Sequence, residues 1–422
     1  MNRGLYTVCL RALAPALWLW MAARARKAGG DWGILAPERF GRHALPPGLR
    51  SPVWVHAVSL GETRAAQPLV QALLDRGLPV LLTHTTATGR QEGARRFAAA
   101  IARGQLRQAW LPYDFPQAAR RFLAHFRPRC GVLIEREVWP NLLAEARAAG
   151  VPVVLASARF SESSLRQTRW LGRALREAYA GLHAVLAQAD DDARRLALAG
   201  APPARVVGNL KFDMAIPAGA MQAGMRWRAQ AGRPVVAIAS TREGEDEMFV
   251  QALAAVPAAE PLLFWLIPRH PQRFDSAAAV LEAAGVPYVR RSQGATQEPP
   301  APPVRVALGD TLGEMPFYYA SADVAIVAGS FAPLGGQNLI EACATGTPVI
   351  VGPHTHHFAD AVRDAVAAGA ALQVADAAAA LRAARDLLGD AHRRAAMAQA
   401  AQRWTARHRG ATRRIMEALP LA

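Results

Sequence analysis

Two successive series of short apolar runs, each alternating with segments of helical periodicity, constrain the fold of this chain more than any other feature. The first series consists of Val53–Val58, Val80–Thr83, Gly131–Glu135, Val151–Ala156 and Ala184–Ala187. The second consists of Val235–Ala239, Leu262–Ile267, Val304–Leu308, Val324–Ala328 and Pro348–Val351. Buried strands separated by helices are typical of parallel sheets with helices on both faces. We therefore predict an α/β protein with two Rossmann-like, doubly wound domains that face a cleft.

Length and composition agree with this division of the chain. At roughly 150 residues per domain, 422 residues suggest two or three domains. Because Pro217 and several glycines interrupt the pattern after Leu210, we place an N-terminal segment at 1–30, a first domain at 31–215 and a second at 216–422. The hydrophobic fraction of 52% excludes a disordered protein, and the mean hydropathy of +0.06 excludes a polytopic membrane protein.

The N-terminal segment is apolar and ends in a basic cluster. Its uncharged run, Ala12–Ala23, is too short to span about 30 Å of hydrocarbon. We expect a helix that lies in or dips into the membrane, with Trp18 and Trp20 at the interface and Arg24, Arg26 and Lys27 on the cytoplasmic side. A signal peptide would need a small-residue cleavage site where these basic residues stand. A core helix of the first domain is the other alternative.

The net charge of +16 is concentrated in one half of the chain. Residues 1–210 carry 29 basic and 14 acidic side chains, whereas 211–422 carry 20 and 19. A two-lobed nucleic-acid-binding protein would place basic residues in both halves, so we expect no nucleic-acid partner but an anionic membrane surface for the first half. The cysteines, Cys9, Cys130 and Cys343, are far apart, which indicates a reducing compartment and no readable metal site.

Carboxylates follow two of the strands expected in the first domain. Glu62 lies in a Ser-x-Gly-Glu turn, where it is either a proton acceptor or a partner of the next helix dipole. Glu135 and Glu137 stand beside Trp139, which suggests a site, although a solvated strand end is the alternative. Lys211 is one of only two lysines, and it hints at a point charge placed against a phosphate or carboxylate.

Glycine-rich or polar turns follow the strands of the second domain and together favour a nucleotide site. Ser240 and Thr241 open a helix where an anion can bind, and Arg269 offers a guanidinium for a phosphate. Asn338 and Glu341 are expected on one helix face, where a carboxylate commonly holds ribose hydroxyls. The fold alone also fits periplasmic binding proteins and several epimerases.

The motifs, in their order, resemble those of the 3-deoxy-D-manno-octulosonic acid (Kdo) transferases of lipid A biosynthesis. They are HAVSLGE (from His56), LPYDFP (from Leu111), E-x-E-x-WPNLL (from Glu135), GNLKFD (from Gly208), PRHPQRF (from Pro268), GDTLGE (from Gly309), GGQNLIEA (from Gly335) and GPHTHHF (from Gly352). The resemblance covers about residues 30 to 360. It implies an inverting, metal-independent glycosyltransferase of the B-type fold that needs no cofactor.

The same resemblance implies partners, location and residue roles. The donor would be CMP-Kdo and the acceptor a phosphorylated lipid A precursor, lipid IVA, at the cytoplasmic face of the inner membrane. Glu62 is similar to the general base of the family, and Glu135, Glu137 and Lys211 to its transition-state-stabilising residues. The resemblance also implies a set of CMP-binding residues, to which we add Ser240 and Thr241 from the turn described above. The full set is Ser240, Thr241, Pro268, Arg269, Leu312, Gly313, Glu314, Asn338, Leu339, Ile340 and Glu341.

Three positions depart from the family pattern, and one of them matters for function. Leu312 stands where Met is usual and Leu339 where Pro is usual, and both changes remain apolar. Arg136, between two carboxylates, replaces a common Thr and can change which carboxylate is ionised or which acceptor is preferred. The enzymatic alternative is a lipid glycosyltransferase with another nucleotide-sugar donor.

Overall fold

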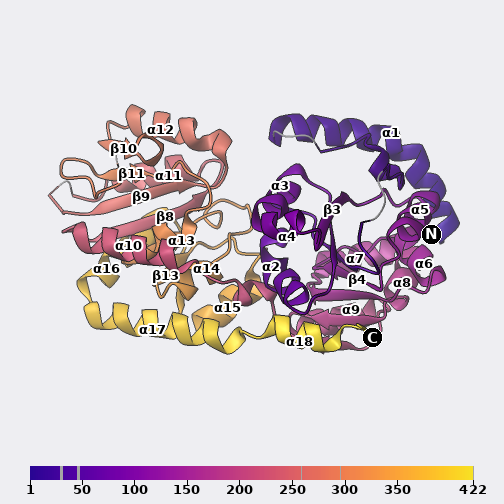
Figure 1. The fold of residues 1–422 in the computed structure, drawn as a ribbon. Helices are drawn as coiled ribbons and strands as arrows, with labels where there is room; N and C mark the ends of the chain where they lie inside the picture. The colour runs from indigo at the N-terminus through magenta and orange to yellow at the C-terminus, as the bar shows by residue number, and fades with distance from the viewer. Residues whose placement is uncertain (29–31, 45–47, 258, 295, 422) are drawn as a thin grey trace. The chain divides into compact units, whose positions relative to one another are not determined.

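The computed structural model describes residues 1–28, 32–44, 48–257, 259–294 and 296–421. The chain divides into two compact units, one of Met1–Met214 with His408–Ala422 and the other of Ala215–Arg407. Each contains a parallel sheet of seven strands with helices on both faces (Figure 1). The expected fold class, two doubly wound α/β sheets, is confirmed. The expected boundary at residues 30 and 31 lies outside the described residues.

The first sheet has the strand order β3-β2-β1-β4-β5-β6-β7. Its strands are β1 (Val53–His56), β2 (Val80–His84), β3 (Leu106–Trp110), β4 (Cys130–Ile134), β5 (Val153–Ala158), β6 (Ala184–Ala187) and β7 (Ala204–Val206). The helices that accompany it are α1 (Arg3–Ala28), η1 (Pro37–Phe40), α2 (Leu60–Asp75), α3 (Ala87–Arg96), α4 (Ala98–Ala102), α5 (Pro116–Phe126), α6 (Pro140–Ala148), α7 (Glu162–Leu171), α8 (Arg173–Ala180), α9 (Asp190–Leu198), η2 (Leu210–Asp213) and α18 (Ala411–Ala418).

Alternate side chains of the central strands fill two separate apolar cores, one on each face of the first sheet. Val53 and Val55 of β1 belong to one core, and Trp54, between them, belongs to the other. All three are fully buried. A sheet that is buried on both faces explains why its strands read as continuous apolar runs.

The second sheet has the strand order β10-β11-β9-β8-β12-β13-β14. Its strands are β8 (Val235–Thr241), β9 (Leu263–Pro268), β10 (Tyr288–Arg290), β11 (Val306–Leu308), β12 (Val324–Val327), β13 (Val349–Val351) and β14 (Ala371–Gln373). Its helices are α10 (Ala218–Gln230), α11 (Glu245–Leu253), η3 (Pro271–Arg273), α12 (Phe274–Ala283), η4 (Arg291–Gln293), α13 (Met315–Ala320), α14 (Ile340–Ala344), α15 (Ala359–Ala367), α16 (Ala377–Gly389) and α17 (Ala391–His408).

The end of the chain differs from the expected single C-terminal domain at 216–422. Helices α17 and α18 are separated at Gly410, whose φ of 96° is left-handed and ends a helix readily. The carboxylate of Asp213 accepts hydrogen bonds from the N–H groups of Gly410 (2.6 Å) and Thr412 (2.5 Å). Ile415 and Met416 of α18 are buried in the core of the first unit. The last helix therefore completes the first sheet's core.

Helix α1 has most of its surface exposed. It runs along the outside of the first unit, drawn in indigo in Figure 1. The segment Arg3–Arg26 is long and apolar enough to cross a membrane by length and composition, and large side chains such as Val8, Leu19 and Trp20 are exposed. This exposure disfavours the alternative of a core helix. Helix α1 is thus a candidate membrane-associating segment.

Candidate active site

In the first unit, the predicted carboxylates lie where the direction of chain winding reverses. From β1 the chain continues through β2 and β3 toward one edge, whereas β4 pairs with the other side of β1 and leads toward the opposite edge. Ligands of doubly wound sheets bind at the carboxyl ends of the strands at this point. Glu62 follows β1, and Glu135 and Glu137 follow β4, so all three belong to the connections that leave this position.

Glu62 lies in the first turn of α2, and local hydrogen bonds fix its orientation. The Ser59 hydroxyl caps the helix by accepting from the Glu62 N–H at 3.4 Å, and the Val58 N–H donates to Glu62 Oε2 at 2.7 Å. Burial raises the pKa of Glu62 to about 8, with further contributions from the charges of Glu135 and Glu137. A carboxyl group with this pKa is poised to accept a proton near neutral pH.

Glu135 and Lys211 form a close ion pair in the first unit. Lys211 Nζ, carried by η2, lies 2.5 Å from Glu135 Oε1, and about 15% of each side chain is exposed. Glu135 adopts a φ of 62°, a strained conformation for a residue with a side chain and one that recurs at functional sites. Burial opposes ionisation, but the Lys211 charge and hydrogen bond hold the pKa of Glu135 below its ordinary value. The pair therefore keeps Glu135 ionised beside the Lys211 cation, and the two charges act in opposite directions on Glu62.

Glu137 is held by the indole of Trp139, whose Nε1–H donates to Glu137 Oε2 at 3.1 Å. Burial raises the pKa of Glu137 to about 7. His56 Nε2 lies 3.9 Å from the same carboxylate, but burial lowers the pKa of His56 to about 3. At these pKa values the two groups are not both charged at any one pH, so the contact is not an ion pair.

His56 is a site residue to which the sequence assigned no role. Its Nδ1 lies 2.9 Å from the Thr83 hydroxyl and 3.1 Å from the Thr83 carbonyl, which holds the ring in place. Its Nε2 is buried and has no hydrogen-bond partner among the described residues. A histidine at the end of a buried strand, three residues before the Ser-x-Gly-Glu turn, was the available signal.

In the second unit, the equivalent reversal of winding lies between β8 and β12. Ser240 and Thr241 end β8, and Ser240 has a left-handed φ of 63°. The fully buried carboxylate of Glu245 connects this turn to the loop after β12, because it accepts from the N–H groups of Gly329 (2.6 Å), Phe331 (2.9 Å) and Arg242 (2.8 Å). No role for Glu245 was predicted from the sequence.

We predict that Glu245→Gln destabilises the second unit. The amide nitrogen that replaces one oxygen faces N–H donors instead of accepting from them, and unsatisfied buried groups of this kind cost about 3 kcal/mol. For a unit of this size that lowers the melting temperature by roughly 6–12 °C. Thermal unfolding measures the change, and Glu247→Gln, at an exposed position of the same helix turn, is the matched control. A melting temperature equal to that of the control would contradict this role.

The predicted phosphate-binding arginine lies at the end of β9. Arg269 Nε donates to the Gln337 side chain at 3.2 Å, and the Arg269 N–H donates to the Thr241 carbonyl at 2.9 Å. Pro268 is buried beside it. Arg269 is therefore tied both to the turn after β8 and to the glycine loop that precedes α14.

The three residues of the Leu312–Glu314 turn differ in exposure, backbone conformation and contacts. Leu312 is 67% exposed, and Gly313 has a φ of 85°. Glu314 is engaged within the unit, where it accepts from Arg291 (2.8 Å) and from the Thr311 hydroxyl. Burial alone would raise its pKa, but these partners hold the pKa of Glu314 below its ordinary value. Its side chain is therefore already neutralised by Arg291.

The segment from Asn338 to Glu341 differs from the expected helix face. Helix α14 begins only at Ile340, and Asn338 precedes it and accepts from the Ile340 N–H at 3.1 Å. Asn338 and Glu341 thus do not share a helix face, because the asparagine lies outside the helix. Leu339 and Ile340 are buried, so a ligand would reach them only through their backbone groups. Glu341, in the first turn, is partly exposed.

The predicted residues therefore fall into two sets, one in each unit. Glu62, Glu135, Glu137 and Lys211 all belong to the first unit. The eleven predicted nucleotide-binding positions, Ser240, Thr241, Pro268, Arg269, Leu312–Glu314 and Asn338–Glu341, all belong to the second. Within the described ranges, no three His, Cys, Asp or Glu side chains are grouped as a metal ion would require.

Comparisons with known proteins match both halves of the chain. Residues 36–214 match the family described as 3-Deoxy-D-manno-octulosonic-acid transferase (kdotransferase), and residues 293–404 match Glycosyl transferases group 1. The chain is 66% identical to the 3-deoxy-D-manno-octulosonic acid transferase of Bordetella pertussis over 426 residues, which cover 99% of each chain. It is 32% identical to the enzyme of that name from Haemophilus influenzae, over 99% of this chain and 98% of the other.

A solved glycosyltransferase has the same fold. The structure from Rickettsia africae aligns with a TM-score of 0.57 over 87% of this chain and 98% of its own, at 12% identity. At that identity the likeness concerns the fold alone. Together with the two seven-stranded parallel sheets, it assigns the B-type glycosyltransferase architecture.

Proposed function

Because this chain belongs to the 3-deoxy-D-manno-octulosonic acid (Kdo) transferase family and is a glycosyltransferase of the B-type fold, we propose that it transfers Kdo from CMP-Kdo to the phosphorylated lipid A precursor lipid IVA. The observation that carries the proposal is the 66% identity to a Kdo transferase along nearly the whole chain. The carboxylate and lysine cluster of the first unit supports it, because an activated hydroxyl and a fixed cation are what such a transfer needs.

The proposed reaction is a single displacement that inverts the anomeric carbon of Kdo. Glu62 accepts the proton of the acceptor hydroxyl while the hydroxyl oxygen bonds to the anomeric carbon, and CMP leaves with the electron pair of the broken bond. Glu135, Glu137 and Lys211 stabilise the charges that develop in the first unit, and Arg269 binds the CMP phosphate in the second. With a pKa of about 8, Glu62 is ionised in about one tenth of molecules at pH 7.

The second unit would bind the nucleotide through its turns. We assign Ser240, Thr241 and Arg269 to the phosphate, and Pro268 with the backbone groups of 312–314 and 338–340 to the remainder of CMP. Glu341 is assigned to the ribose hydroxyls. The hydrogen bonds from Arg269 to Gln337 and to the Thr241 carbonyl support the residues assigned to the phosphate, because they hold Arg269 beside the turn after β8.

We predict that Glu341→Gln raises the KM for CMP-Kdo by about tenfold, because a hydrogen bond to a charged acceptor is worth about 1.5 kcal/mol or more. The KM for the acceptor should not change. Steady-state kinetics with each substrate varied in turn measures both constants, and Glu282→Gln, at an exposed helix end, is the control. An unchanged KM for CMP-Kdo would remove the ribose role.

We place the enzyme on an anionic membrane, at the cytoplasmic face of the inner membrane. The exposed apolar side chains of α1 support this location, as do the exposed Arg24 and Arg26 near its end. The basic excess of the first 210 residues, 29 against 14 acidic, fits both an anionic membrane and a phosphorylated lipid.

One incubation tests the proposed function. Purified protein is mixed with CMP-Kdo and lipid IVA, and the lipid product is weighed by mass spectrometry. We expect a mass increase of one or more Kdo units. The same incubation with UDP-sugars in place of CMP-Kdo tests the alternative donor. A product formed only with a UDP-sugar would contradict the proposal.

A further inference from the structure

A cavity of about 380 Å³ opens beside the carboxylates of the first unit. The loop from Arg136 to Pro140 forms one wall and includes Glu137. Residues of helices α7 and α8 also line it, as does Tyr6 of α1. A cavity of this size is within the range of small-molecule sites. It therefore adjoins the proposed reaction centre and shares Glu137 with it.

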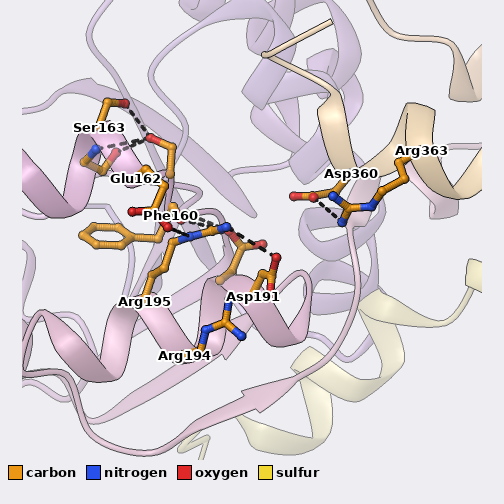
Figure 2. Close-up of polar contacts among 11 residues, drawn as sticks. Phe160, Glu162, Ser163, Asp191, Arg194, Arg195, Asp360 and Arg363 are labelled. Atoms are coloured by element: carbon orange, nitrogen blue, oxygen red, sulfur yellow. Dashed lines mark hydrogen bonds and ion pairs between the residues drawn. The ribbon is translucent and has the colours of Figure 1, made fainter. Parts of the chain in front are cut away.

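Hydrogen bonds hold the walls of this cavity in place. The start of α7 is clamped by Arg195, which donates to Glu162 (2.9 Å), to Asp191 (3.4 Å) and to the Phe160 carbonyl (3.3 Å), as Figure 2 shows. On the α1 side, the Tyr6 hydroxyl donates to Asp114 at 2.9 Å. Such preformed walls reduce the entropy that a ligand must overcome on binding.

The chemistry of the lining suits a sugar that carries an anionic group. Trp139, Phe160 and Tyr179 supply aromatic surface against which a sugar ring can pack. Arg136 is the one cationic residue of the lining, its side chain is exposed, and no carboxylate among the described residues forms an ion pair with it. Its guanidinium therefore keeps its full set of donors, in a fork that matches a phosphate or carboxylate.

We propose that this cavity binds the phosphorylated sugar end of the acceptor and that Arg136 recognises its phosphate. The inference rests on the proposed function for the identity of the acceptor. Arg136 acts as a specificity-determining residue, because it contributes binding energy only to acceptors that carry the anion. The carboxylate of Kdo is the other anion that Arg136 could bind, and the experiment below distinguishes it from the acceptor phosphate.

The test is the kinetics of Arg136→Ala with two acceptors, lipid IVA and the same lipid with its phosphates removed enzymatically. We expect the KM for lipid IVA to rise by about 10- to 100-fold while the KM for CMP-Kdo stays near wild type. The KM for the dephosphorylated lipid should not change. Arg136→Lys should recover part of the loss, because it restores the charge without the fork.

Two further variants control for charge and for occupation of the cavity. Arg166→Ala removes an exposed arginine of α7 that does not line the cavity, and it should leave all constants unchanged. Gln167→Trp places a large ring in the cavity and should raise the KM for both acceptors, whereas Gln167→Ala should not.

Other results would overturn the inference. An equal effect of Arg136→Ala on both acceptors, or a rise in the KM for CMP-Kdo, would assign Arg136 to the fold or to the Kdo carboxylate. Binding of lipid IVA in detergent micelles without any donor gives a reading independent of turnover. If the wild-type protein binds lipid IVA but transfers no Kdo, the proposed function fails. In that case, weaker binding of lipid IVA by Arg136→Ala but not by Arg166→Ala would still support the cavity as the acceptor site.

Discussion

Replacement of Glu62 by Gln is expected to lower kcat by 10²- to 10⁴-fold while the KM for CMP-Kdo stays near its wild-type value. The loss follows from the removal of the proton acceptor, whose typical contribution has this size. The Gln side chain keeps an oxygen that can accept from the Val58 N–H, so the local structure should persist. Single-turnover kinetics with intact CMP-Kdo measures the effect, and Asp75→Asn, at the other end of α2, is the matched control.

The pH dependence of the reaction is a second test of the role of Glu62 as the base. Because the base must be ionised and its pKa is about 8, the wild-type rate should rise with pH and level off above about 8. The raised pKa also means that ionisation of Glu62 disfavours the folded state. The protonated Glu62 therefore contributes fully to the free energy of unfolding below its ordinary pKa of 4.5, and this contribution is lost as the pH rises through 8. Glu62→Gln should therefore resist alkaline unfolding better than wild type. A variant with near-normal turnover would exclude Glu62 as the base.

Replacement of Lys211 by Met is expected to affect both stability and rate. It leaves the Glu135 charge mostly buried without its partner, which typically costs about 3 kcal/mol, or roughly 6–12 °C in melting temperature. It also removes a fixed cation, which typically lowers kcat by 10²- to 10³-fold. Thermal unfolding and kinetics of the purified variant measure the two effects separately.

A double variant distinguishes a lost charge pair from a general packing defect. Lys211→Met with Glu135→Gln buries two neutral groups, so its melting temperature should lie above that of Lys211→Met alone. Since the pKa of Glu135 is lowered, the pair contributes fully above pH 4.5 and its contribution is lost as pH falls through the lower value. The difference between wild type and Lys211→Met should therefore shrink on acidification. An additive double variant would contradict the pairing.

The central strands could be predicted from the sequence because they are buried on both faces and read as apolar runs. Strand β3 was missed because Arg107 and Gln108 interrupt its apolar pattern. Strands β7, β10 and β14 are three-residue edge strands with partly exposed side chains, so their sequences carry little periodicity. The helix expected at Asp390–Ala418 is divided at Gly410, which is left-handed and donates a hydrogen bond to the distant Asp213.

The sequence predicted the candidate site from residue type and from position after the strands. Carboxylates directly after buried strands and a rare lysine identified Glu62, Glu135, Glu137 and Lys211, and the structure places them in one unit. The role of Glu245 was not predictable, because a glutamate at a helix start is equally well explained by the helix dipole. The cavity beside Glu137 was not predictable either, since its walls come from α1, α7 and α8.

The chain enters the first unit at its beginning and returns to it at its end, which has a consequence for biosynthesis. The core of the first unit includes Ile415 and Met416, so it cannot be completed until the second unit has been synthesised. During translation, part of the core of the first unit stays exposed until the last helix has been synthesised. The second unit is continuous in sequence and can fold before the first unit is complete. A premature stop codon in the last turns would therefore damage the first unit and spare the second.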